Sequence, residues 1–215
     1  TDVNPENYKG SSDYELLFSD LIRFDPDVVI MGNLHACERE HGWVRNLLNS
    51  WPVFFVTHDF YWLTGRCAFP DSCTKFLDVQ CNADCPSYFE YPALPPAEIR
   101  GAANEKAALV AHPNAFVLAN SNYMERIVDS TLTKRDVQVA DLDTKLQNAW
   151  LGAETDHFFL DANEQRQEAR EKLGLPLGKT IVIFPSGDFS QLRKNPAAVL
   201  RIVAMLPADM FHAIF

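Results

Sequence analysis

Short apolar runs alternate along this chain with segments of helical periodicity, and this alternation limits the possible folds more than any other feature. The run Val28–Met31 is continuous and mostly β-branched, as strands are when both faces of a parallel sheet are buried. The segment before it repeats apolar residues at helical spacing behind the capping box Ser12-x-x-Glu15. We therefore expect an α/β protein with a doubly wound parallel sheet.

The same alternation continues to the end of the sequence and indicates two domains. The composition changes over residues 151–163, so we expect residues 1–155 to form most of a first domain and residues 156–215 a linker and the start of a second. Because the chain stops inside the apolar run His212–Phe215, we expect a fragment cut at both ends. The predicted strands cover residues 28–31, 53–57, 115–119 and 180–184, with a short strand or loop edge at 137–140; the predicted helices cover 12–22, 43–48, 95–110, 120–127, 164–173 and 196–206.

Polar, titratable side chains follow two of the predicted strands at the point where each strand ends. His58 and Asp59 come directly after the run Val53–Thr57, and His35 follows the preceding strand. Ligands collect at the carboxyl ends of parallel strands, so these side chains are candidates for a site. The loop that then opens at residues 58–96 is too long for a simple connector, which favours a functional lid or a small folded subunit.

Four of the five cysteines lie in this loop, at positions 67, 73, 81 and 85. Cys67, Cys73, Cys81 and Cys85 are close enough in sequence to surround one structural zinc, although the spacing is looser than in paired CxxC knuckles. Reduced, unliganded thiols and a disulfide are the other interpretations, and the sequence does not choose among the three. Cys37 lies outside the cluster and is expected to be a small hydrophobic residue.

The charge and hydropathy of the chain exclude several classes of partner. A formal net charge of -10 argues against binding to nucleic-acid backbones and against strong attachment to anionic lipid. The apolar runs are too short to cross a bilayer, and residues 1–10 are too polar for a signal peptide. We expect a cytoplasmic protein with at most peripheral contact at the inner face of the membrane.

Five linked segments of the chain resemble bacterial family-4 glycosyltransferases of the colanic-acid and exopolysaccharide type. The resemblance implies the GT-B fold, in which an acceptor-binding Rossmann-like domain faces a second domain that binds the nucleotide sugar. It covers most of the chain from about residue 26 onward and does not identify the sugar. The segments, in order, are THDFYWLTGRCAFPDSC, CNADCPSYFEYP, ANSNYMERIVDSTL, LGAETDHFFLDANEQRQEAREKLGLP and FPSGDFSQLRKNP.

The resemblance assigns roles to the side chains near the cysteine loop. His58 corresponds to a histidine beside the transferred sugar, where it bonds a hydroxyl or supports charge at the anomeric carbon. Asp59 is expected to join it, or only to orient the loop or the imidazole. His35 is expected to line the acceptor cleft. Arg66 has two candidate roles, which are contact with the acceptor and bracing of the cysteine loop.

The resemblance also implies a donor site in the second domain. Lys194, with Arg193 beside it, is expected to neutralise the diphosphate of the nucleotide sugar as it leaves. The family has glycine where this chain has Asn195, which either tightens the turn or weakens phosphate binding. Leu151 and Asp188 are further departures from the family pattern.

The implied reaction moves a sugar from a nucleotide-diphosphate sugar to a hydroxyl of a saccharide or lipid-linked acceptor, in polysaccharide biosynthesis and with retained configuration. It requires no catalytic metal, so a zinc here would be structural. The carboxylate pair that grips the donor is expected beyond residue 215, so this fragment alone should be inactive. The alternatives are a noncatalytic binding module on a decayed glycosyltransferase scaffold, and a nucleotide-sugar epimerase or another GT-B phosphoryl-sugar enzyme.

Overall fold

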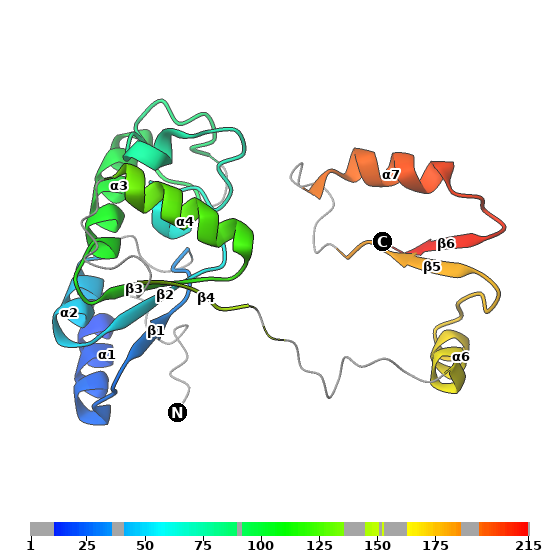
Figure 1. Ribbon diagram of the computed structural model, residues 1–215, viewed down its shortest axis with the longest axis horizontal. Helices are drawn as coiled ribbons and strands as arrows, with labels where there is room; N and C mark the ends of the chain where they lie inside the picture. Colours follow the sequence, from blue (N-terminus) through cyan, green and yellow to red (C-terminus); the bar gives the residue numbers. More distant parts are fainter. Residues whose placement is uncertain are drawn as a thin grey trace. The chain divides into compact units, whose positions relative to one another are not determined.

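The computed structural model divides the chain into two compact units, Thr1–Gly152 and Ala153–Phe215. It describes residues 11–35, 41–89, 92–135, 145–150, 152, 163–185 and 194–214. Figure 1 colours the first unit from blue to yellow-green and the second from yellow to red. Each unit is α/β, and each is described by itself below.

The first unit contains a parallel sheet of four strands in the order β1-β2-β3-β4. The central strands β2 and β3 pair in register from Val53 with Ala115 to Thr57 with Ala119. Helices connect the strands, which confirms the predicted α/β class with a parallel sheet and agrees with a Rossmann-like fold. The strands are β1 (Val29–Met31), β2 (Val53–Thr57), β3 (Ala115–Ala119) and β4 (Leu146–Asn148); the helices are α1 (Ser11–Phe24), α2 (Gly42–Ser50), α3 (Pro96–Val110) and α4 (Asn122–Lys134).

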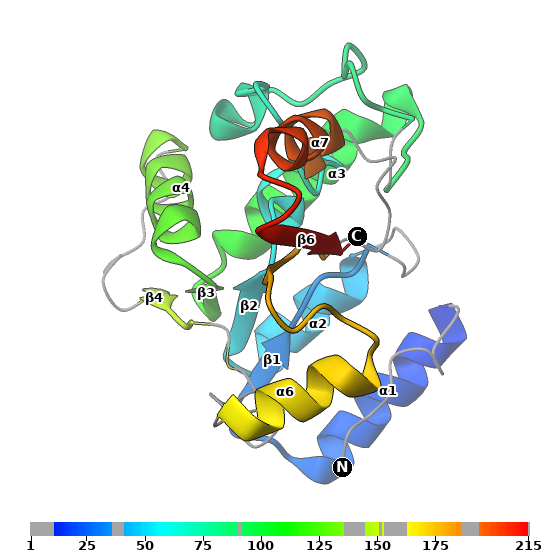
Figure 2. The same cartoon turned by 90° about the vertical axis from the view of Figure 1, so that its right-hand side faces the viewer.

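The core of this unit holds part of the long loop as well as the sheet. Trp62, in the one-turn helix η2 (Tyr61–Leu63), is fully buried and packs edge-on against Phe55 of β2, with ring centroids 4.7 Å apart. Its indole N–H donates to the carbonyl of Gly32 at the end of β1, at 3.2 Å. A second one-turn helix, η3 (Lys75–Asp78), lies farther along the loop and buries Phe76. Figures 1 and 2 show this loop at one end of the unit, beside α3.

Two features of the first unit differ from the sequence expectation. Helix α4 continues to Lys134, past the expected end at Ile127, because Val128 and Leu132 extend its buried face. The sheet also gains β4 at its edge, which the sequence did not predict. The expected strand at 137–140 lies outside the described residues.

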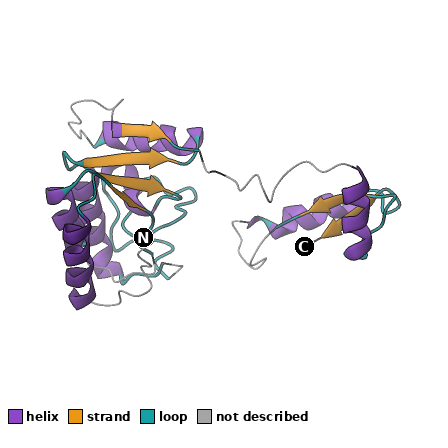
Figure 3. Cartoon of the chain, turned by 90° about the horizontal axis from the view of Figure 1, so that it is seen from below, coloured by secondary structure: helices purple, strands orange, loops and turns teal. Residues whose placement is uncertain are grey.

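The second unit pairs two parallel strands, β5 (Thr180–Ile183) and β6 (Phe211–Ile214), from Thr180 with Phe211 to Ile183 with Ile214. Helix α6 (Asn163–Lys172) precedes β5, and α7 (Pro196–Met205) connects the two strands. Gly174, at φ 67°, follows α6 as the sequence predicts. Figure 3 shows the strands of both units in orange. Within the described ranges of the chain, no helix combines the length and apolar character that crossing a bilayer requires.

Candidate functional site

The carboxyl ends of β1, β2 and β3 lie at the same edge of the sheet because the strands are parallel. His58 follows β2 and is exposed. Its backbone carbonyl accepts a hydrogen bond from the Asn120 side chain after β3, at 3.3 Å. The His58 ring lies close to Gly32, the residue after β1. A Cβ atom added to Gly32 would be 3.7 Å from Nε2 of His58. His58 therefore lies among three strand ends, at an edge that a ligand can reach.

Asp59 is buried and organises the turn that follows β2. Its Oδ1 accepts a hydrogen bond from the backbone N–H of Tyr61, at 2.8 Å. Its Oδ2 lies 3.2 Å from Nε2 of His35, which comes from the segment after β1. The structure thus brings Asp59 close to His35, another of the predicted site residues, while its hydrogen bond to Tyr61 orients the loop.

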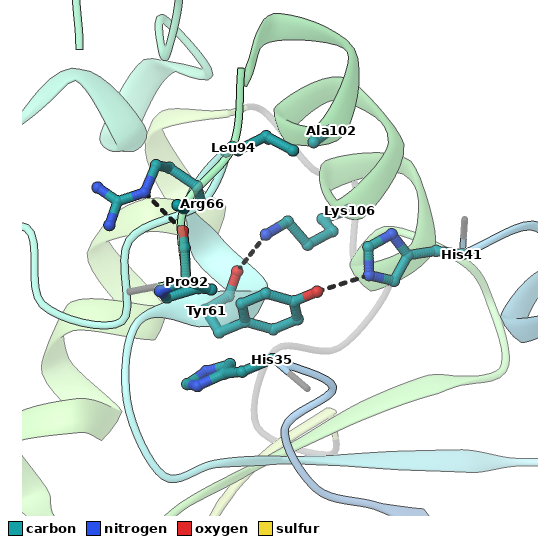
Figure 4. A pocket seen from close by; sticks show the side chains of 10 residues that line it. His35, His41, Tyr61, Arg66, Pro92, Leu94, Ala102 and Lys106 are labelled. Carbon is teal, nitrogen blue, oxygen red and sulfur yellow. Dashed lines mark hydrogen bonds between the residues drawn. The ribbon is translucent and has the colours of Figure 1, made fainter. Parts of the chain in front are cut away.

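A cavity of about 340 Å³ lies next to these strand ends, and this volume falls within the range of small-molecule sites. His35 and Arg66, the two residues predicted to bind an acceptor, both line it. His58, Asp59 and Lys194 do not belong to its lining. Figure 4 shows the cavity with His41, Tyr61 and Lys106 around it. The full lining is His35, His41, Tyr61, Gly65, Arg66, Pro92, Ala93, Leu94, Ala102 and Lys106.

Lys106 is a buried cation of this cavity, with 1% of its surface exposed. Its Nζ donates to the carbonyl of Tyr61 at 2.8 Å and lies 3.8 Å from the centroid of the Tyr61 ring. Burial lowers the pKa of Lys106 to about 7, against the opposing effect of the Cys81, Cys67, Asp59 and Glu105 charges. An ammonium has further N–H donors besides the one that bonds Tyr61, so Lys106 can donate to a ligand in the cavity.

His41 joins the segment before α2 to the loop and to α3. It is 2% exposed, and its Nε2 lies 2.8 Å from the Tyr61 hydroxyl while its Nδ1 lies 3.3 Å from Oε2 of Glu105. Burial lowers the pKa of His41; the Lys106 charge lowers it further and Glu105 opposes both. The imidazole is therefore held in its neutral form at neutral pH.

Arg66 lines the cavity and also braces the cysteine loop, one of the two roles that the sequence left open. It is 3% exposed, and its Nε donates to the carbonyl of Pro92 at 2.8 Å. Its Nη1 donates to the carbonyl and the hydroxyl of Ser87 and approaches the sulfur of Cys67 at 3.7 Å. Five guanidinium donors allow one side chain to fix several loop carbonyls together.

The four cysteines of the loop are free thiols, so none is in a disulfide. All four line a second, small cavity of about 20 Å³. Burial raises the pKa of Cys67 to about 11 and also raises the pKa of Cys81, which does not suit a nucleophile. Across the described ranges, no three His, Cys, Asp or Glu side chains already lie as metal ligands would. Cys37 lies outside the described residues.

Comparisons with known proteins found none that is similar to this chain. No family model, no curated protein and no solved structure matches the chain. The site is therefore defined by its own residues and geometry.

The predicted donor residues lie in the second unit. Lys194 is exposed and lies two residues before the start of α7. Asn195 adopts the left-handed conformation, with φ 48°, and its Oδ1 accepts a hydrogen bond from the backbone N–H of Ala198 at 3.3 Å. Asparagine tolerates this conformation better than most residues, so it can stand at a position where glycine is otherwise expected. Arg193, Leu151 and Asp188 lie outside the described residues.

Lys106 and His41 are functional candidates that the sequence did not reveal. Lys106 occupies one stripe of α3 with Ile99, Ala103 and Val110, all at helical spacing and all buried. A lysine inside an apolar stripe is the signal that identifies a buried cation from sequence. For His41, no comparable pattern exists, because its partners Tyr61 and Glu105 come from distant segments.

Proposed function

We propose that this chain is part of a retaining GT-B glycosyltransferase that transfers a sugar from a nucleotide-diphosphate donor to a saccharide or lipid-linked acceptor in polysaccharide biosynthesis. The observation that carries this proposal is the shared cavity of His35 and Arg66. They follow different strands, yet they line one cavity beside the carboxyl ends of β1 and β2. Oδ2 of Asp59 lies 3.2 Å from Nε2 of His35.

In this proposal the acceptor occupies the cavity and the transferred sugar lies near His58. Tyr61, Pro92 and Leu94 provide apolar surface for the face of a sugar ring. His35 and Lys106 provide polar groups for its hydroxyls. His58 lies exposed at the neighbouring strand end, where it can bond a hydroxyl of the donor sugar or support charge at the anomeric carbon.

The donor diphosphate binds Lys194 in this proposal. The side chain is exposed two residues before α7, so the ammonium and the amino end of a ten-residue helix are close in sequence. Both favour a negative charge, the lysine through its full charge and the helix through its dipole. The leaving diphosphate takes the acceptor proton during front-face attack, so no protein base is required.

A noncatalytic binding module is the second candidate, and the surface of the cysteine loop favours it. Phe69, Tyr88 and Phe89 are exposed large apolar side chains of this loop, with Phe89 67% exposed. Exposed aromatic groups on one loop are typical of protein docking surfaces. In this case the loop binds a protein partner and the cavity contributes no chemistry.

Thermal-shift measurements on the full-length protein distinguish the two candidates. UDP-, GDP-, TDP- and ADP-sugars are added to the wild type, to Lys194→Ala and to the matched control Lys172→Ala. Lys172 is an exposed lysine of α6. We expect one nucleotide class to raise the Tm of the wild type and of Lys172→Ala, but not of Lys194→Ala. His58→Ala should then lower kcat/KM for transfer by about 10²-fold.

No shift with any donor, in protein that remains folded, contradicts the glycosyltransferase proposal and favours the binding module. Loss of the shift in both lysine variants contradicts the specific role of Lys194. His35→Ala gives an independent check on the cavity, because it should raise KM for the acceptor and leave KM for the donor unchanged.

A further inference from the structure

The cysteine loop is weakly packed in the part that carries most of its thiols. Between residues 69 and 89, Phe76 is the one buried side chain, although this stretch includes Cys73, Cys81 and Cys85. The stretch forms only the one-turn helix η3. Leu77 and Cys81 are partly buried against the core. This limited apolar burial does not offset the conformational entropy of ordering about twenty residues, which indicates an additional source of order.

The four thiols of the loop border one small cavity. Cys67, Cys73, Cys81 and Cys85 all line the cavity of about 20 Å³, which is roughly the size that holds one water-sized sphere. Phe76 and Ile99 line it too, so the cavity lies between the loop and α3. Gly65 passes close by, since a Cβ placed on it would be 3.1 Å from the Cβ of Cys81.

Hydrogen-bond donors surround the sulfur atoms. Nη1 of Arg66 donates to the sulfur of Cys67, and the backbone N–H of Gly65 bonds Cys81. The Ser87 hydroxyl lies 3.9 Å from the sulfurs of both Cys67 and Cys85. Donors around sulfur stabilise thiolates more than thiols, and such donors form the outer shell of metal–thiolate centres.

Two buried cations lie beside the thiols. Arg66 lines the same small cavity, and the charges of Cys81 and Cys67 act on Lys106. Both side chains are almost fully buried. Buried charges are costly unless a charge of opposite sign lies nearby. One Zn²⁺ with four thiolates has a net charge of −2, which Arg66 and the protonated form of Lys106 balance. Negative charge on Cys81 and Cys67 raises the pKa of Lys106 and so favours that form.

We infer that Cys67, Cys73, Cys81 and Cys85 bind one Zn²⁺ in a tetrahedral Cys₄ site that orders the loop between β2 and α3. Zinc is the expected metal because soft thiolates in tetrahedral geometry select it. The thiols border one cavity without forming a ready ligand set, so binding draws the sulfurs inward by rotation about χ1. This site is structural, and it does not depend on the proposed sugar transfer.

Metal analysis of the whole 215-residue chain tests the inference. The chain is purified under reducing conditions without chelator, and bound metals are measured by inductively coupled plasma mass spectrometry. We expect about one zinc per chain in the wild type and in the matched control Cys37→Ser, and loss of most of it in Cys81→Ser and Cys85→Ser. Cobalt in place of zinc should give the intense visible bands of a tetrahedral thiolate centre.

A folded wild type that lacks zinc overturns the inference, and so does iron in place of zinc. Equal zinc content in Cys37→Ser, Cys81→Ser and Cys85→Ser overturns it as well.

A cysteine variant that misfolds would lose zinc for an unrelated reason. A second measurement therefore uses only the wild type and follows its cleavage by trypsin with and without a chelator. A chelator should release the zinc and expose Lys75 to trypsin, while circular dichroism retains most of the helical signal and added zinc restores protection. Cleavage at Lys75 that is the same with and without chelator contradicts a metal-ordered loop.

Discussion

At the scale of single residues, His41 makes the stability of the fold depend on pH. Its pKa in the folded chain is lowered from 6.5 by burial first and by Lys106 second. As pH falls below about 6.5, the unfolded chain takes up a proton that the folded chain resists. The stability contributed by neutral His41 is therefore complete above this pH and is lost on acidification.

We expect His41→Gln to reduce this loss. Urea unfolding followed by tryptophan fluorescence between pH 7 and pH 5 should give a smaller fall in the free energy of unfolding for His41→Gln than for the wild type. His58→Gln, at an exposed position, is the matched control and should follow the wild type. The lowered pKa of His112 acts in the same direction in all three chains. The difference between the wild type and His41→Gln therefore reports on His41 together with its charge interaction with Lys106. Parallel pH profiles in the wild type and His41→Gln would contradict this role.

Which site residues can be predicted from sequence depends on how local their environment is. His35 and Asp59 follow strands, and strand order alone places them at one edge of a parallel sheet. The apolar stripe of α3 marks Lys106 as buried, but its contact with Tyr61, like the contacts of His41, joins distant segments that meet only after the chain has folded. For Arg66 the sequence left two roles open, and the contacts with Ser87 and Pro92 establish the bracing one.

At the scale of elements, the contact between the cysteine loop and α3 depends on a glycine. A Cβ on Gly65 would be 2.6 Å from the carbonyl oxygen of Ile99, which is backbone and cannot rotate away. We expect Gly65→Ala to lower the free energy of unfolding by about 1–3 kcal/mol, because loop and helix must separate. The matched control Gly101→Ala lies inside α3 with no atom within 4 Å of its Cβ.

Because alanine is the better helix former, Gly101→Ala should raise the free energy of unfolding by about 0.5–1 kcal/mol. Urea titration of both variants measures the two opposite changes. A neutral or stabilising Gly65→Ala would mean that the loop does not pack tightly on α3.

The elements differ in how well the sequence predicts them, and their length and burial explain why. The strands β2 and β3 follow their apolar runs residue for residue, because five consecutive apolar or small residues favour a buried strand. Strand β4 has three residues, Leu146–Asn148, of which only Leu146 is buried. Its strand geometry comes from pairing with β3, and nothing in its own composition indicates a strand.

At the scale of the whole molecule, apolar burial is divided unequally between the two units. Every buried hydrophobic side chain of the described residues belongs to the first unit, from Tyr14 to Leu146. Helix α7 buries none of its side chains and leaves Met205 83% exposed. Since apolar burial is the main favourable term in folding, the first unit should account for nearly all of the measured stability.

Separating the units at residue 152 tests this expectation. We expect residues 1–152 to unfold cooperatively, with a Tm close to that of the whole chain, because their core is retained. Residues 153–215 should give no cooperative transition in calorimetry and should exchange their amide hydrogens rapidly, because few apolar groups protect β5 and β6. A sharp transition in the 153–215 fragment would show that the second unit has stability of its own. A large fall in the Tm of residues 1–152 would show that the second unit stabilises the first.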